Sequence, residues 1–473
     1  MTSSGDRRPH AGDRMIPTPP PVGERSQVRL RALVPGSASA RVEPLPGTGR
    51  RVVTVRVDPA HRRGALSAED SATLAEGARL ALSQRIPLLV VLASSGADLD
   101  EGVASLHAWG TAALALSQCS GVVPVVIVAV GLALSGPALL LGLADAVVMT
   151  PDAVAYVSGP AAVAQWSGQL LSPDALGGLA VHDRSTGVAA LTAPDEDAAV
   201  EAATALLGHL PDHCDALAPT SPSADPVGRT NPELRDLIPV SATGSYDVRE
   251  VVRAIADDGD LLELRARSAP QLVTALARVG GAPVGVVANQ PQAMAGTLDI
   301  AASQKGARFV SFCDSFNLPL LTLVDTPGFM PGKDLEWRGM IRHGAELVYA
   351  YAESQVPRVC LVLRKAFGGA YIVMDSKGIG NDICLAWPSA QIAVMGARGA
   401  VQILHRREDL ATQVELAQRY EEELLNPYTA AARGFVDRVI DPAETRAAVV
   451  SAFDMLAGKR ETLVSRKHGN GPL

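Results

Sequence analysis

The amino-acid sequence predicts an α/β protein built from two copies of one parallel-sheet domain. Three observations support this fold class. Short apolar runs of strand length alternate with helix-like stretches, which is typical of parallel strands joined by crossover helices. Four matched segments recur in the same order at a nearly constant spacing, which indicates a duplication. A stretch rich in Ser, Pro, Asp and Gly separates the two copies.

The chain of 473 residues has the composition of a globular protein with a large core. Hydrophobic residues make up 47% and charged residues 19%, enough for two or three domains. The net charge of −8 and the pI of about 5.7 argue against a general nucleic-acid-binding surface. The five cysteines form no CxxC pair, which argues against a zinc site or a disulfide framework and favours a reducing cytoplasm.

Residues 1–26 are expected to form a disordered tail. This segment is rich in Pro, Arg and Gly, a composition that does not support a packed core. It contains no apolar h-region, so we do not expect it to act as a secretory signal. The first folded domain is therefore predicted over residues 27–219.

The apolar stretch 121–144 is predicted to hold a buried strand, with a membrane-spanning helix as the alternative. GVVPVVIVAVGLALSGPALLLGLA carries no charge and is long enough to cross a bilayer. However, Pro124, Gly131 and Gly136 are among the residues that interrupt it. A strand buried on both faces of a parallel sheet also reads as a continuous apolar run. We therefore expect a strand at VVPVVIVAV, a turn at GLALSGP and then the start of a buried helix, with no membrane span.

The repeat is visible as pairs of similar segments separated by 232 or 233 residues. IPLLVVLASSG begins at Ile86 and LPLLTLVDTPG begins at Leu318, an offset of 232. VVPVVIVAV and VPRVCLVL place Pro124 and Pro357 at an offset of 233, and the same offset joins the pair 135–136 (SG) to the pair 368–369 (GG). AVAYVSGPAAV then resembles AQIAVMGARGAV. A repeat of this length indicates two copies of one domain.

The second copy is predicted over residues 248–473, after a linker at 220–247. The linker TSPSADPVGRTNPELRDLIPVSATGSYD has a turn-rich composition. Between the apolar runs LPLLTLVD and VPRVCLVL, the segment GMIRHGAELVYAYAESQ repeats apolar residues at helical spacing. Strand, helix and strand in this order predict a right-handed crossover in a parallel sheet.

The stretch FGGAY, at residues 367–371, follows one of these predicted strands. Function in open parallel sheets collects at the carboxyl ends of the strands. If a helix begins here, the amides of Gly369 and Ala370 lie at its positive end, where two N–H groups can hold a developing oxyanion. The alternative is a tight turn chosen for packing. The equivalent turn in the first copy favours the functional interpretation.

Other motifs give weaker signals. DTPG at 325–328 resembles a GTPase segment, but the sequence has no GxxxxGK[ST] phosphate cradle. It also has no GxSxG nucleophile elbow. His343 and His405 are expected to be structural or solvated. Arg364 and Lys365 either bind an anionic group or stabilise the end of the strand, and the sequence does not separate these alternatives.

Several segments closely resemble the carboxyltransferase (β) subunits of biotin-dependent acyl-CoA carboxylases. The segments LPLLTLVDTPGFMPGKD, VPRVCLVLRKAFGGAYIVMDSK and AWPSAQIAVMGARGAV carry the resemblance, which spans residues 230–473 almost without gaps. Parts of the first half, such as SSGADLDEGVASL, are also similar to the family. The resemblance implies two crotonase-like domains per chain, in agreement with the repeat.

The resemblance also implies a mechanism based on backbone amides. Carboxybiotin on a partner carrier domain supplies CO₂, and the biotin ureido nitrogen takes the α-proton of the acyl-CoA. By motif, Gly369 and Ala370 hold the biotin oxygen, and Ser135 and Gly136 hold the thioester oxygen. The biotin and acyl pocket is expected to be lined by Gly328, Phe329, Gly368, Tyr371 and Ile372. No metal is implied in this chain.

The family assembles as ring-shaped hexamers with biotin-bearing α subunits. Its active site lies between the N domain of one chain and the C domain of another. The resemblance therefore implies a hexamer, of this chain or with a related β subunit. It also implies a biotin carboxylase and biotin-carrier α subunit as partner.

The first half departs from the family pattern at three places. The long N-terminal part, with its RxPYGDG-like and Phe-Gly-Gly-Ser segments, is shortened here. ASSGAD at 93–98 replaces the usual DSGGAR, and GLALSG at 131–136 replaces GPCAGG. These changes lie in the half expected to hold CoA. Three functions stay open: an active carboxyltransferase, an acyl-CoA decarboxylase of the same fold, and a non-catalytic subunit that assembles with a complete one.

Ile372 suggests which acyl-CoA is used. Many family members that prefer propionyl-CoA carry Asp at this place, whereas several that accept acetyl-CoA carry an apolar residue. We therefore expect acetyl-CoA to be carboxylated at least comparably with propionyl-CoA, giving malonyl-CoA and methylmalonyl-CoA. The alternative is that Ile372 simply packs at the start of a helix.

Overall fold

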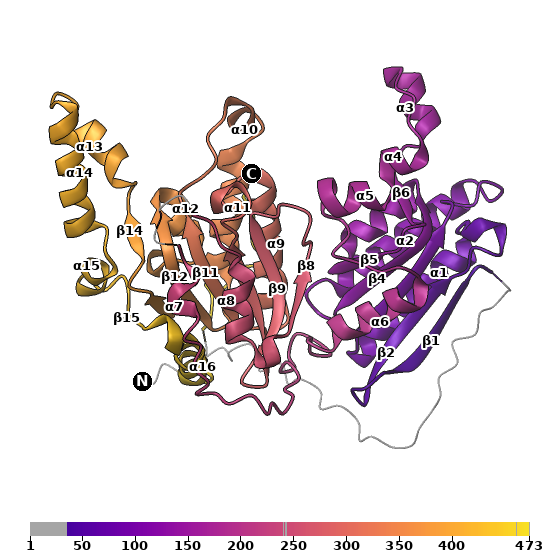
Figure 1. Cartoon of the computed structure of the whole chain (residues 1–473). Helices are drawn as coiled ribbons and strands as arrows, with labels where there is room; N and C mark the ends of the chain where they lie inside the picture. The colour runs from indigo at the N-terminus through magenta and orange to yellow at the C-terminus, as the bar shows by residue number, and fades with distance from the viewer. Residues whose placement is uncertain (1–35, 240, 242–243, 460, 473) are drawn as a thin grey trace, which may run out of the picture.

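Two sheets lie side by side in the structure, each covered by helices (Figure 1). The computed structural model describes residues 36–239, 241, 244–459 and 461–472. The predicted tail, residues 1–26, lies outside the described residues. We call the part from β1 to α6 the N half and the part from α8 to α16 the C half.

The N half contains a seven-stranded sheet in the order β1-β2-β3-β4-β5-β7, with β6 pairing beside β4. Its strands are β1 (Ala38–Leu45), β2 (Arg50–Val57), β3 (Leu88–Ser94), β4 (Val125–Leu134), β5 (Ala146–Met149), β6 (Val154–Tyr156) and β7 (Leu191–Thr192). Its helices are α1 (Ala68–Gln84), α2 (Val103–Cys119), α3 (Pro160–Ser167), α4 (Pro173–Gly177), α5 (Leu179–Val181) and α6 (Glu196–Leu207), with the short turns η1 (Arg62–Gly64), η2 (Gly136–Leu143) and η3 (His182–Thr186).

The C half contains an eight-stranded sheet in the order β15-β13-β12-β11-β10-β9-β8, with β14 pairing beside β12. Its strands are β8 (Leu261–Leu264), β9 (Leu272–Val279), β10 (Ala282–Asn289), β11 (Leu320–Thr326), β12 (Arg358–Phe367), β13 (Ile383–Ala386), β14 (Gln391–Ala393) and β15 (Arg438–Val439). Its helices are α8 (Val248–Ile255), α9 (Ile300–Ser315), α10 (Lys333–Trp337), α11 (Met340–Glu353), α12 (Gly368–Val373), α13 (Ala397–Leu404), α14 (Leu410–Leu424), α15 (Pro427–Ala432) and α16 (Thr445–Leu456), with η4 (Asp257–Gly259), η5 (Met294–Gly296), η6 (Lys377–Ile379) and η7 (Pro442–Glu444).

The layers follow from the apolar faces of the elements. Helices α1 and α2 pack on one face of the N sheet, and α8 and α16 pack on the outer face of the C sheet. A single central core joins the two sheets through apolar residues of α6, α9 and α11. The two halves therefore share one continuous hydrophobic interior, which fixes their relative position.

The duplication is confirmed by the pairing register of the central strands. In the N sheet Leu88 pairs with Val125, and in the C sheet Leu320 pairs with Arg358. Both ladders also shift register at the same place, after Leu92 in the first copy and after Val324 in the second. The offsets in these pairs are again 232 and 233 residues, so the sequence repeat corresponds to a structural repeat.

The sheets are mixed, which corrects the expectation of a purely parallel arrangement. Strands β1 and β2 form an antiparallel hairpin at one edge, and β8, β9 and β10 are antiparallel to one another. The hairpin turns contain glycines with positive φ, Gly47 and Gly49 in one and Gly280 and Gly281 in the other. Short Gly-rich turns join neighbouring antiparallel strands directly and are a sequence signal for a hairpin. The sequence-based prediction did not include these hairpins.

The apolar stretch 121–144 folds as a strand followed by a short helical turn, with one difference from the expectation. β4 continues through the predicted turn region and ends only at Leu134, because its last residues pair with β6. The turn is therefore confined to Ser135 and the start of η2. In the part of the chain that the structure describes, we find no helix with the length and apolar character needed to cross a membrane.

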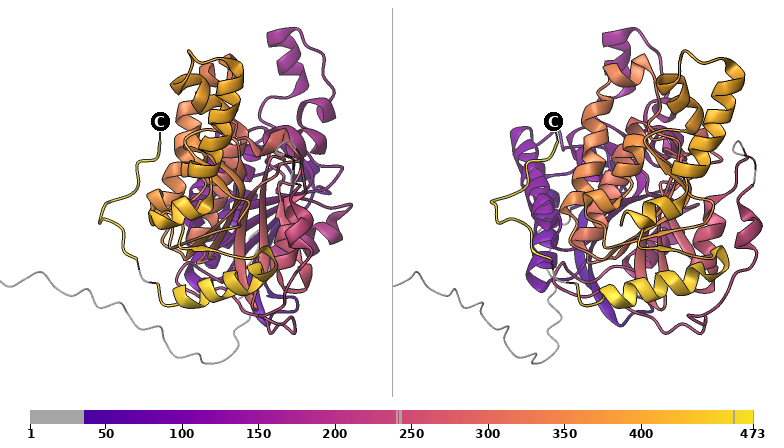
Figure 2. Two further views of the ribbon diagram at one scale, coloured as in Figure 1. Left: turned by 60° about the vertical axis from the view of Figure 1, so that its left-hand side comes forward. Right: turned by 90° about the vertical axis from the view of Figure 1, so that its left-hand side faces the viewer.

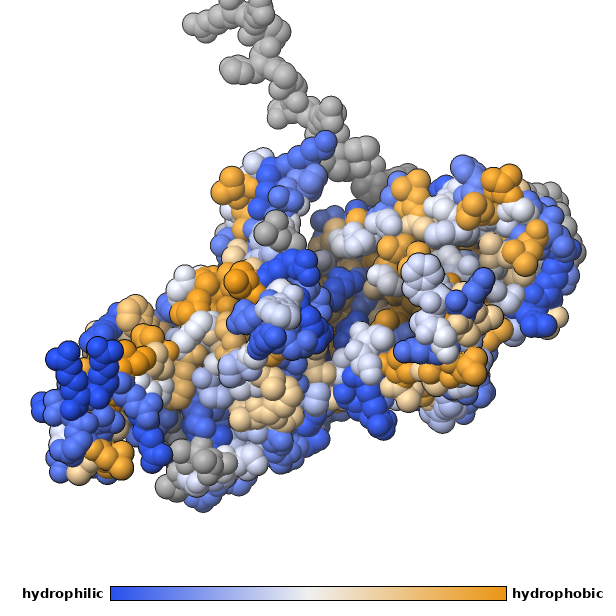
Figure 3. All heavy atoms as spheres, turned by 90° about the horizontal axis from the view of Figure 1, so that it is seen from above, coloured by the Kyte–Doolittle hydropathy of each residue, from blue (hydrophilic) through white to orange (hydrophobic). Residues whose placement is uncertain are grey.

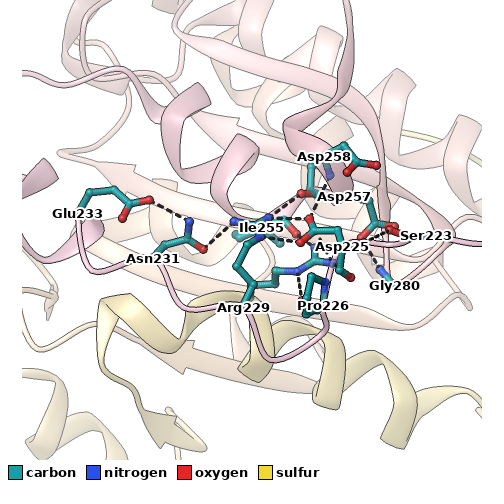
Figure 4. Close-up of polar contacts among 12 residues, drawn as sticks. Ser223, Asp225, Pro226, Arg229, Asn231, Glu233, Ile255, Asp257, Asp258 and Gly280 are labelled. Atoms are coloured by element: carbon teal, nitrogen blue, oxygen red, sulfur yellow. Dashed lines mark hydrogen bonds and ion pairs between the residues drawn. The ribbon is translucent and has the colours of Figure 1, made fainter.

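The described part of residues 220–247 contains one short helix, α7 (Leu234–Leu237), and is held against the C half by polar contacts. Asp225 accepts two hydrogen bonds from Arg229, at 2.6 and 2.8 Å, and one from the Asp258 amide at 3.0 Å. The fully buried Arg446 of α16 donates to the carbonyl of Pro226 and to the Asp257 carboxylate. Figure 4 shows this cluster between the linker and the C sheet.

Helical parts of both halves project from the body on the same side (Figures 1 and 2). They include α3 of the N half and, in the C half, α10 and the pair α13 and α14. Helix α3 and the pair α13 and α14 carry several exposed apolar side chains. These are Trp166 and Leu170 on and after α3, and Ile403, Leu404, Leu410 and Val414 on the C-half pair.

Candidate active site

The FGGAY turn lies where β12 passes directly into α12. Phe367 ends the strand, and Gly369 and Ala370 are the second and third residues of the helix. The first N–H groups of a helix have no partner within it. Among the described residues, the amides of Gly369 and Ala370 have no acceptor. The sequence-based expectation of a helix beginning at this turn therefore agrees with the geometry.

The two amides differ in accessibility. Gly369 is exposed, whereas Ala370 is fully buried and its methyl group packs in the central core. Gly368 has a φ of +60°, a conformation that favours glycine. A Cβ added to Gly368 would also lie 3.1 Å from the Val394 carbonyl oxygen. The structure thus makes Gly369 the accessible donor of the predicted pair, a distinction that the sequence does not reveal.

The loop after β11 brings Gly328 and Phe329 to the same place. A Cβ added to Gly369 would lie 3.5 Å from the Phe329 ring. The Leu298 amide donates to the Gly328 carbonyl at 3.2 Å, and the Met330 amide donates to the Leu298 carbonyl at 2.8 Å. These bonds fix the loop beside the start of α12. Gly328 and Phe329 therefore lie together with Gly369, as the resemblance implied.

Tyr371 and Ile372 point in different directions from α12. Tyr371 is buried among the core residues, and burial followed by the nearby Cys384 and Cys360 thiols raises the pKa of its hydroxyl. Ile372 is 42% exposed. Of these two predicted pocket residues, Ile372 has an exposed side chain, whereas the Tyr371 side chain belongs to the protein core.

A buried ionic cluster behind the turn was missed by the sequence analysis. Arg364 donates to the Asp325 carboxylate at 3.0 Å, and Tyr246 donates to the same carboxylate at 2.9 Å. The Lys365 amide donates to the other Asp325 oxygen at 3.1 Å. Arg364 also lies over the Tyr246 ring, 5.3 Å from its centroid. Arg364 is thus engaged within the protein and is not free to bind an anionic ligand.

This cluster ties together the ends of the two strands that carry the site. Asp325 stands near the end of β11 and Arg364 near the end of β12. Burial raises the pKa of the Asp325 carboxyl, and Arg364 acts in the opposite direction. The DTPG motif, of which Asp325 is the first residue, therefore has a structural role here. The sequence signal for this cluster is an Asp near the end of one predicted strand and an Arg near the end of the next. The two residues can be assigned as partners only when the order of the strands in the sheet is known.

The turn in the N half is built differently at the level of its amides. Ser135 has a φ of +64°, and its amide donates to the Tyr156 carbonyl at 2.9 Å. The next amide, that of Gly136, has no acceptor among the described residues. A Cβ on Gly136 would come within 2.7 Å of the Trp109 ring. Of the predicted thioester pair, only Gly136 keeps an available N–H, because Ser135 is used by strand β6.

A basic turn lies beside Ser135. The Ser95 amide donates to the Arg63 carbonyl at 3.1 Å, and Gly96 lies against Ser135, with its Cβ position 3.4 Å from the serine Cβ. Arg62 and Arg63 both have positive φ. Arg62 forms an ion pair with Asp98 of the ASSGAD segment. This turn of the N half therefore carries two arginines, of which Arg62 is paired with Asp98.

The equivalent turn of the C half carries no charge. Met294 and Ala295 also have positive φ and stand 232 residues after Arg62 and Arg63. A Cβ on Gly296 would come within 2.5 Å of the Asp325 carbonyl oxygen, which places this turn against the end of β11. The two copies thus offer similar backbone shapes with different electrostatics. In the described part of the chain, no cluster of His, Cys, Asp or Glu suited to a metal ion is found.

Two mixed sheets related by duplication, each with a tight turn that starts a helix after the central strand, define the carboxyltransferase class of crotonase-like folds. Residues 47–471 match the family model described as carboxyl transferase domain. The chain belongs to this family, and the resemblance inferred from the sequence is confirmed. The members of this family are enzymes, and the relatives of this chain are named as carboxylases and carboxyltransferases.

Individual relatives are similar over most of their length. The chain is 44% identical to a propionyl-CoA carboxylase beta chain of Saccharopolyspora erythraea, covering 90% of this chain and 81% of the relative. It is 43% identical to the methylmalonyl-CoA carboxyltransferase 12S subunit of Propionibacterium freudenreichii subsp. shermanii, covering 90% and 82%. A methylmalonyl-CoA decarboxylase subunit alpha of Veillonella parvula is 38% identical, covering 90% and 83%.

A solved structure supports the fold directly. The transcarboxylase 12S structure superposes with a TM-score of 0.90 at 42% identity, covering 92% of this chain and 85% of that chain. That structure is described as a hexamer assembly with methylmalonyl-coenzyme A and methylmalonic acid bound. The prediction of a duplicated crotonase-like fold is thereby confirmed.

Proposed function

We propose that this chain is the carboxyltransferase subunit of a biotin-dependent acyl-CoA carboxylase. It would move a carboxyl group from carboxybiotin to the α-carbon of a short acyl-CoA. The observation that carries the proposal is the exposed, unpaired amide of Gly369 at the start of α12 in a member of the carboxyl transferase family. Such an amide stabilises negative charge that develops on an oxygen, and no side-chain nucleophile is required.

The residues of the C half fit the biotin ring. Gly369 leaves the space of a side chain open in front of its amide, and Phe329 supplies an apolar wall beside it. The uncharged turn at Met294 and Ala295 adds no cation at this site. Carboxybiotin, when bound, supplies CO₂ and a ureido nitrogen that can accept a proton. The Gly369 amide, followed by that of Ala370, would hold the ureido oxygen and stabilise its negative charge.

The residues of the N half fit an acyl-CoA. The Gly136 amide would hold the thioester oxygen when it becomes an enolate oxygen. Arg63, for which no ion pair is found among the described residues, carries positive charge on the adjacent turn, where phosphate groups of CoA would be stabilised. The contrast between this basic turn and the uncharged turn of the C half supports CoA binding to the N half and biotin binding to the C half.

We infer that the complete site forms between two copies of the chain. Each chain carries one turn of each kind, in different halves of the molecule (Figure 1). The projecting helices carry exposed apolar side chains, Trp166 being 94% exposed. From above, apolar residues gather in separate places over both halves (Figure 3). A hexamer that buries these side chains, with a biotin-bearing α subunit as partner in the cytoplasm, is the assembly that we propose.

Decarboxylation is the second candidate function. Relatives named methylmalonyl-CoA decarboxylase subunit alpha are 38% and 39% identical to this chain. The same amides would stabilise the same enolate if the reaction ran from a carboxyacyl-CoA to biotin. A non-catalytic role beside a complete β subunit is the third candidate, and the loss of the Ser135 amide as a donor favours it.

The experiment that separates these functions uses the purified chain with biotin-carrier and biotin carboxylase subunits. Incorporation of labelled bicarbonate into acetyl- or propionyl-CoA would support the carboxyltransferase. Biotin-dependent loss of CO₂ from malonyl- or methylmalonyl-CoA without forward carboxylation would instead support the decarboxylase. Absence of both reactions, together with absence of CoA binding by calorimetry, would contradict the proposal and leave the non-catalytic role.

A further inference from the structure

A cavity between the two halves of the chain concentrates positive charge away from the catalytic turns. Its volume is about 280 Å³. The N half contributes the end of η2 and the end of η3 with the two residues that follow it, and the C half contributes α9 and the loop after β8. Arg265, Lys305 and Arg308 line this cavity, together with the hydroxyl-bearing Ser185, Thr186 and Ser268.

Arg265 is held in the cavity wall by its backbone and by one side-chain nitrogen. Its amide donates to the Ala190 carbonyl at 2.8 Å, and its Nε donates to the Gly187 carbonyl at 2.8 Å. Its φ of +56° is unusual for a residue with a side chain. Its Nε bond to Gly187 is the side-chain hydrogen bond found for Arg265 among the described residues, so its two terminal nitrogens have no acceptor there. Four of the five N–H donors of this side chain are therefore available to a ligand.

Carboxylates on the segments around the cavity are already paired with other residues. Glu263 pairs with Arg249 at 2.6 Å. Asp183 pairs with Arg267 at 3.1 Å. Asp145 lies 3.4 Å from Arg308, the second guanidinium of the cavity, and also accepts the Val125 amide. Among the described residues, Arg265 is left as a guanidinium group without a counter-ion.

Burial makes this arrangement unfavourable for the cations by themselves. Burial, followed by repulsion from Arg308, lowers the pKa of Arg265 to about 10. Burial is also the main reason why the pKa of Lys305 falls to about 7. The Lys305 ammonium group donates to the carbonyls of Arg265 and Ser268, each at 2.9 Å, so it stabilises the same loop. Charges removed from water are normally paired, and an anion in the cavity would supply the missing partner.

We propose that this cavity is a binding site for a small phosphate-bearing anion, held by Arg265 and Arg308. Guanidinium groups bind phosphate through paired N–H donors. Ser268 is only 7% exposed and lines the cavity, so its hydroxyl can donate a further hydrogen bond. Because both halves form the walls, the bound anion would stabilise the contact between them. This site is independent of the proposed biotin and CoA turns, neither of which lines it.

Inorganic phosphate is the probe for this site. Binding to the full-length chain is measured by calorimetry, and thermal unfolding is followed in phosphate and in chloride at matched ionic strength. We expect saturable phosphate binding, and we expect phosphate to raise the melting temperature more than chloride does. Arg265→Gln should weaken phosphate binding at least tenfold. Arg267→Gln is the matched control, because this neighbouring, half-exposed arginine does not line the cavity.

A second variant tests the site if Arg265→Gln does not fold. Gln304 lines the cavity and is exposed, so Gln304→Glu should place a negative charge at the wall with little effect on folding. It should weaken phosphate binding while the melting temperature in chloride stays within a few degrees of the original. Phosphate stabilisation no greater than that by chloride, or unchanged binding in the folded variants, would overturn the proposal. Complete competition between phosphate and CoA would also overturn it, since the cavity would then be part of the CoA site.

Discussion

At the scale of single residues, the proposed chemistry depends on the absence of a side chain at Gly369. This residue is exposed, its amide is unpaired, and Phe329 stands 3.5 Å from the position of an added Cβ. Its φ lies outside the left-handed region, so a substitution there does not force the backbone into strain. Gly368, one residue earlier, has the positive φ that makes the turn. The two glycines of the FGGAY turn therefore have separate roles, one conformational and one chemical.

Gly369→Val should strongly reduce carboxyl transfer without unfolding the protein. The branched side chain would crowd the biotin oxygen beside Phe329 and remove the use of the amide. Losing one oxyanion donor costs about 3–4 kcal/mol, so we expect turnover to fall by about 10²–10³-fold. Turnover is measured with the α subunit present, and circular dichroism checks folding. Gly378→Val, at an exposed glycine beyond α12, is the control, and unchanged turnover in Gly369→Val would refute the assignment.

Ile372→Asp should shift the preference among acyl-CoA substrates. The Ile372 side chain is 42% exposed one turn into α12, so a carboxylate can be accommodated there. One methylene in a pocket is worth about 1–3 kcal/mol, so the change should be graded. We expect the ratio of kcat/KM for acetyl-CoA to that for propionyl-CoA to decrease in the variant. Equal ratios in both proteins would mean that Ile372 is a packing residue.

Asp325→Asn should destabilise the fold strongly. The substitution leaves the buried Arg364 without its counter-charge and disturbs the hydrogen bonds from Tyr246 and Lys365. Breaking a buried pair from one side typically costs about 3–5 kcal/mol. Urea unfolding measures the loss. Asp334→Asn is the control, because its ion pair with Arg338 is exposed and such pairs contribute about 0–1 kcal/mol. Equal stabilities for the two variants would contradict the structural role of Asp325.

At the scale of elements, the linker is held by ionic contacts as well as by the apolar packing of Leu234 and Tyr246. Asp225 is the centre of this attachment, since it accepts bonds from Arg229 and from the Asp258 amide (Figure 4). Arg446 of α16 also contacts this carboxylate, with a guanidinium nitrogen 3.5 Å from an Asp225 carboxylate oxygen. The linker is therefore bound to the C half through ionisable groups, and its attachment should respond to pH.

Stability should decrease in acid through the titration of Asp225. The hydrogen bonds from Arg229 lower the pKa of this carboxyl from 3.8 to about 2, and its side chain is only 6% exposed. Because the pKa of Asp225 is lower in the folded protein than in the unfolded chain, its carboxylate stabilises the fold at pH values above 3.8. This stabilisation is lost as the pH falls from 3.8 to about 2. The contribution is about 2 kcal/mol. Urea unfolding at pH 5 and pH 3 should show a larger loss in the original protein than in Asp225→Asn, and parallel losses would contradict this.

At the scale of the whole molecule, the chain offers two half-sites that need a partner. The N half has the basic turn and the Gly136 amide, and the C half has the Gly369 amide. The helices that project beside them, α3 and the pair α13 and α14, expose large apolar side chains. Exposed apolar patches of this kind mark protein interfaces. Assembly and activity are therefore expected to depend on each other.

The purified chain should form an oligomer, with a hexamer as the expected state. Light scattering at micromolar concentration measures its mass, and a monomer would count decisively against the proposal. Trp166→Glu, on the projecting helix α3, should weaken assembly and reduce turnover together, because a charge would enter the interface. Trp337→Glu is a matched control on α10, where the ring is also exposed. Unchanged assembly in Trp166→Glu would exclude α3 from the interface.

Much of the architecture could be predicted because its signals are local and occur twice. The apolar strands around Ile86 and Leu318, the helix that begins at Met340 and the turn at Gly369 all appear where the pattern places them. The period of apolar residues sets the type of element, and glycine sets the turn. The antiparallel edge hairpins were not predicted, although Gly280 and Gly281 signal one of them, because the alternation of apolar runs with helical segments predicts parallel pairing.

The sequence by itself determined the duplication, the family and the position of the Gly369 turn, because each is written in contiguous residues. Only the tertiary structure decided which groups are available for chemistry. It occupies the Ser135 amide with Tyr156, pairs Arg364 with Asp325, and leaves Arg265 without a counter-ion. Each of these outcomes depends on strand order or on the contact between the two halves. Hydrogen bonding and desolvation act through space, so residues far apart in the sequence determine whether a donor or a charge is free.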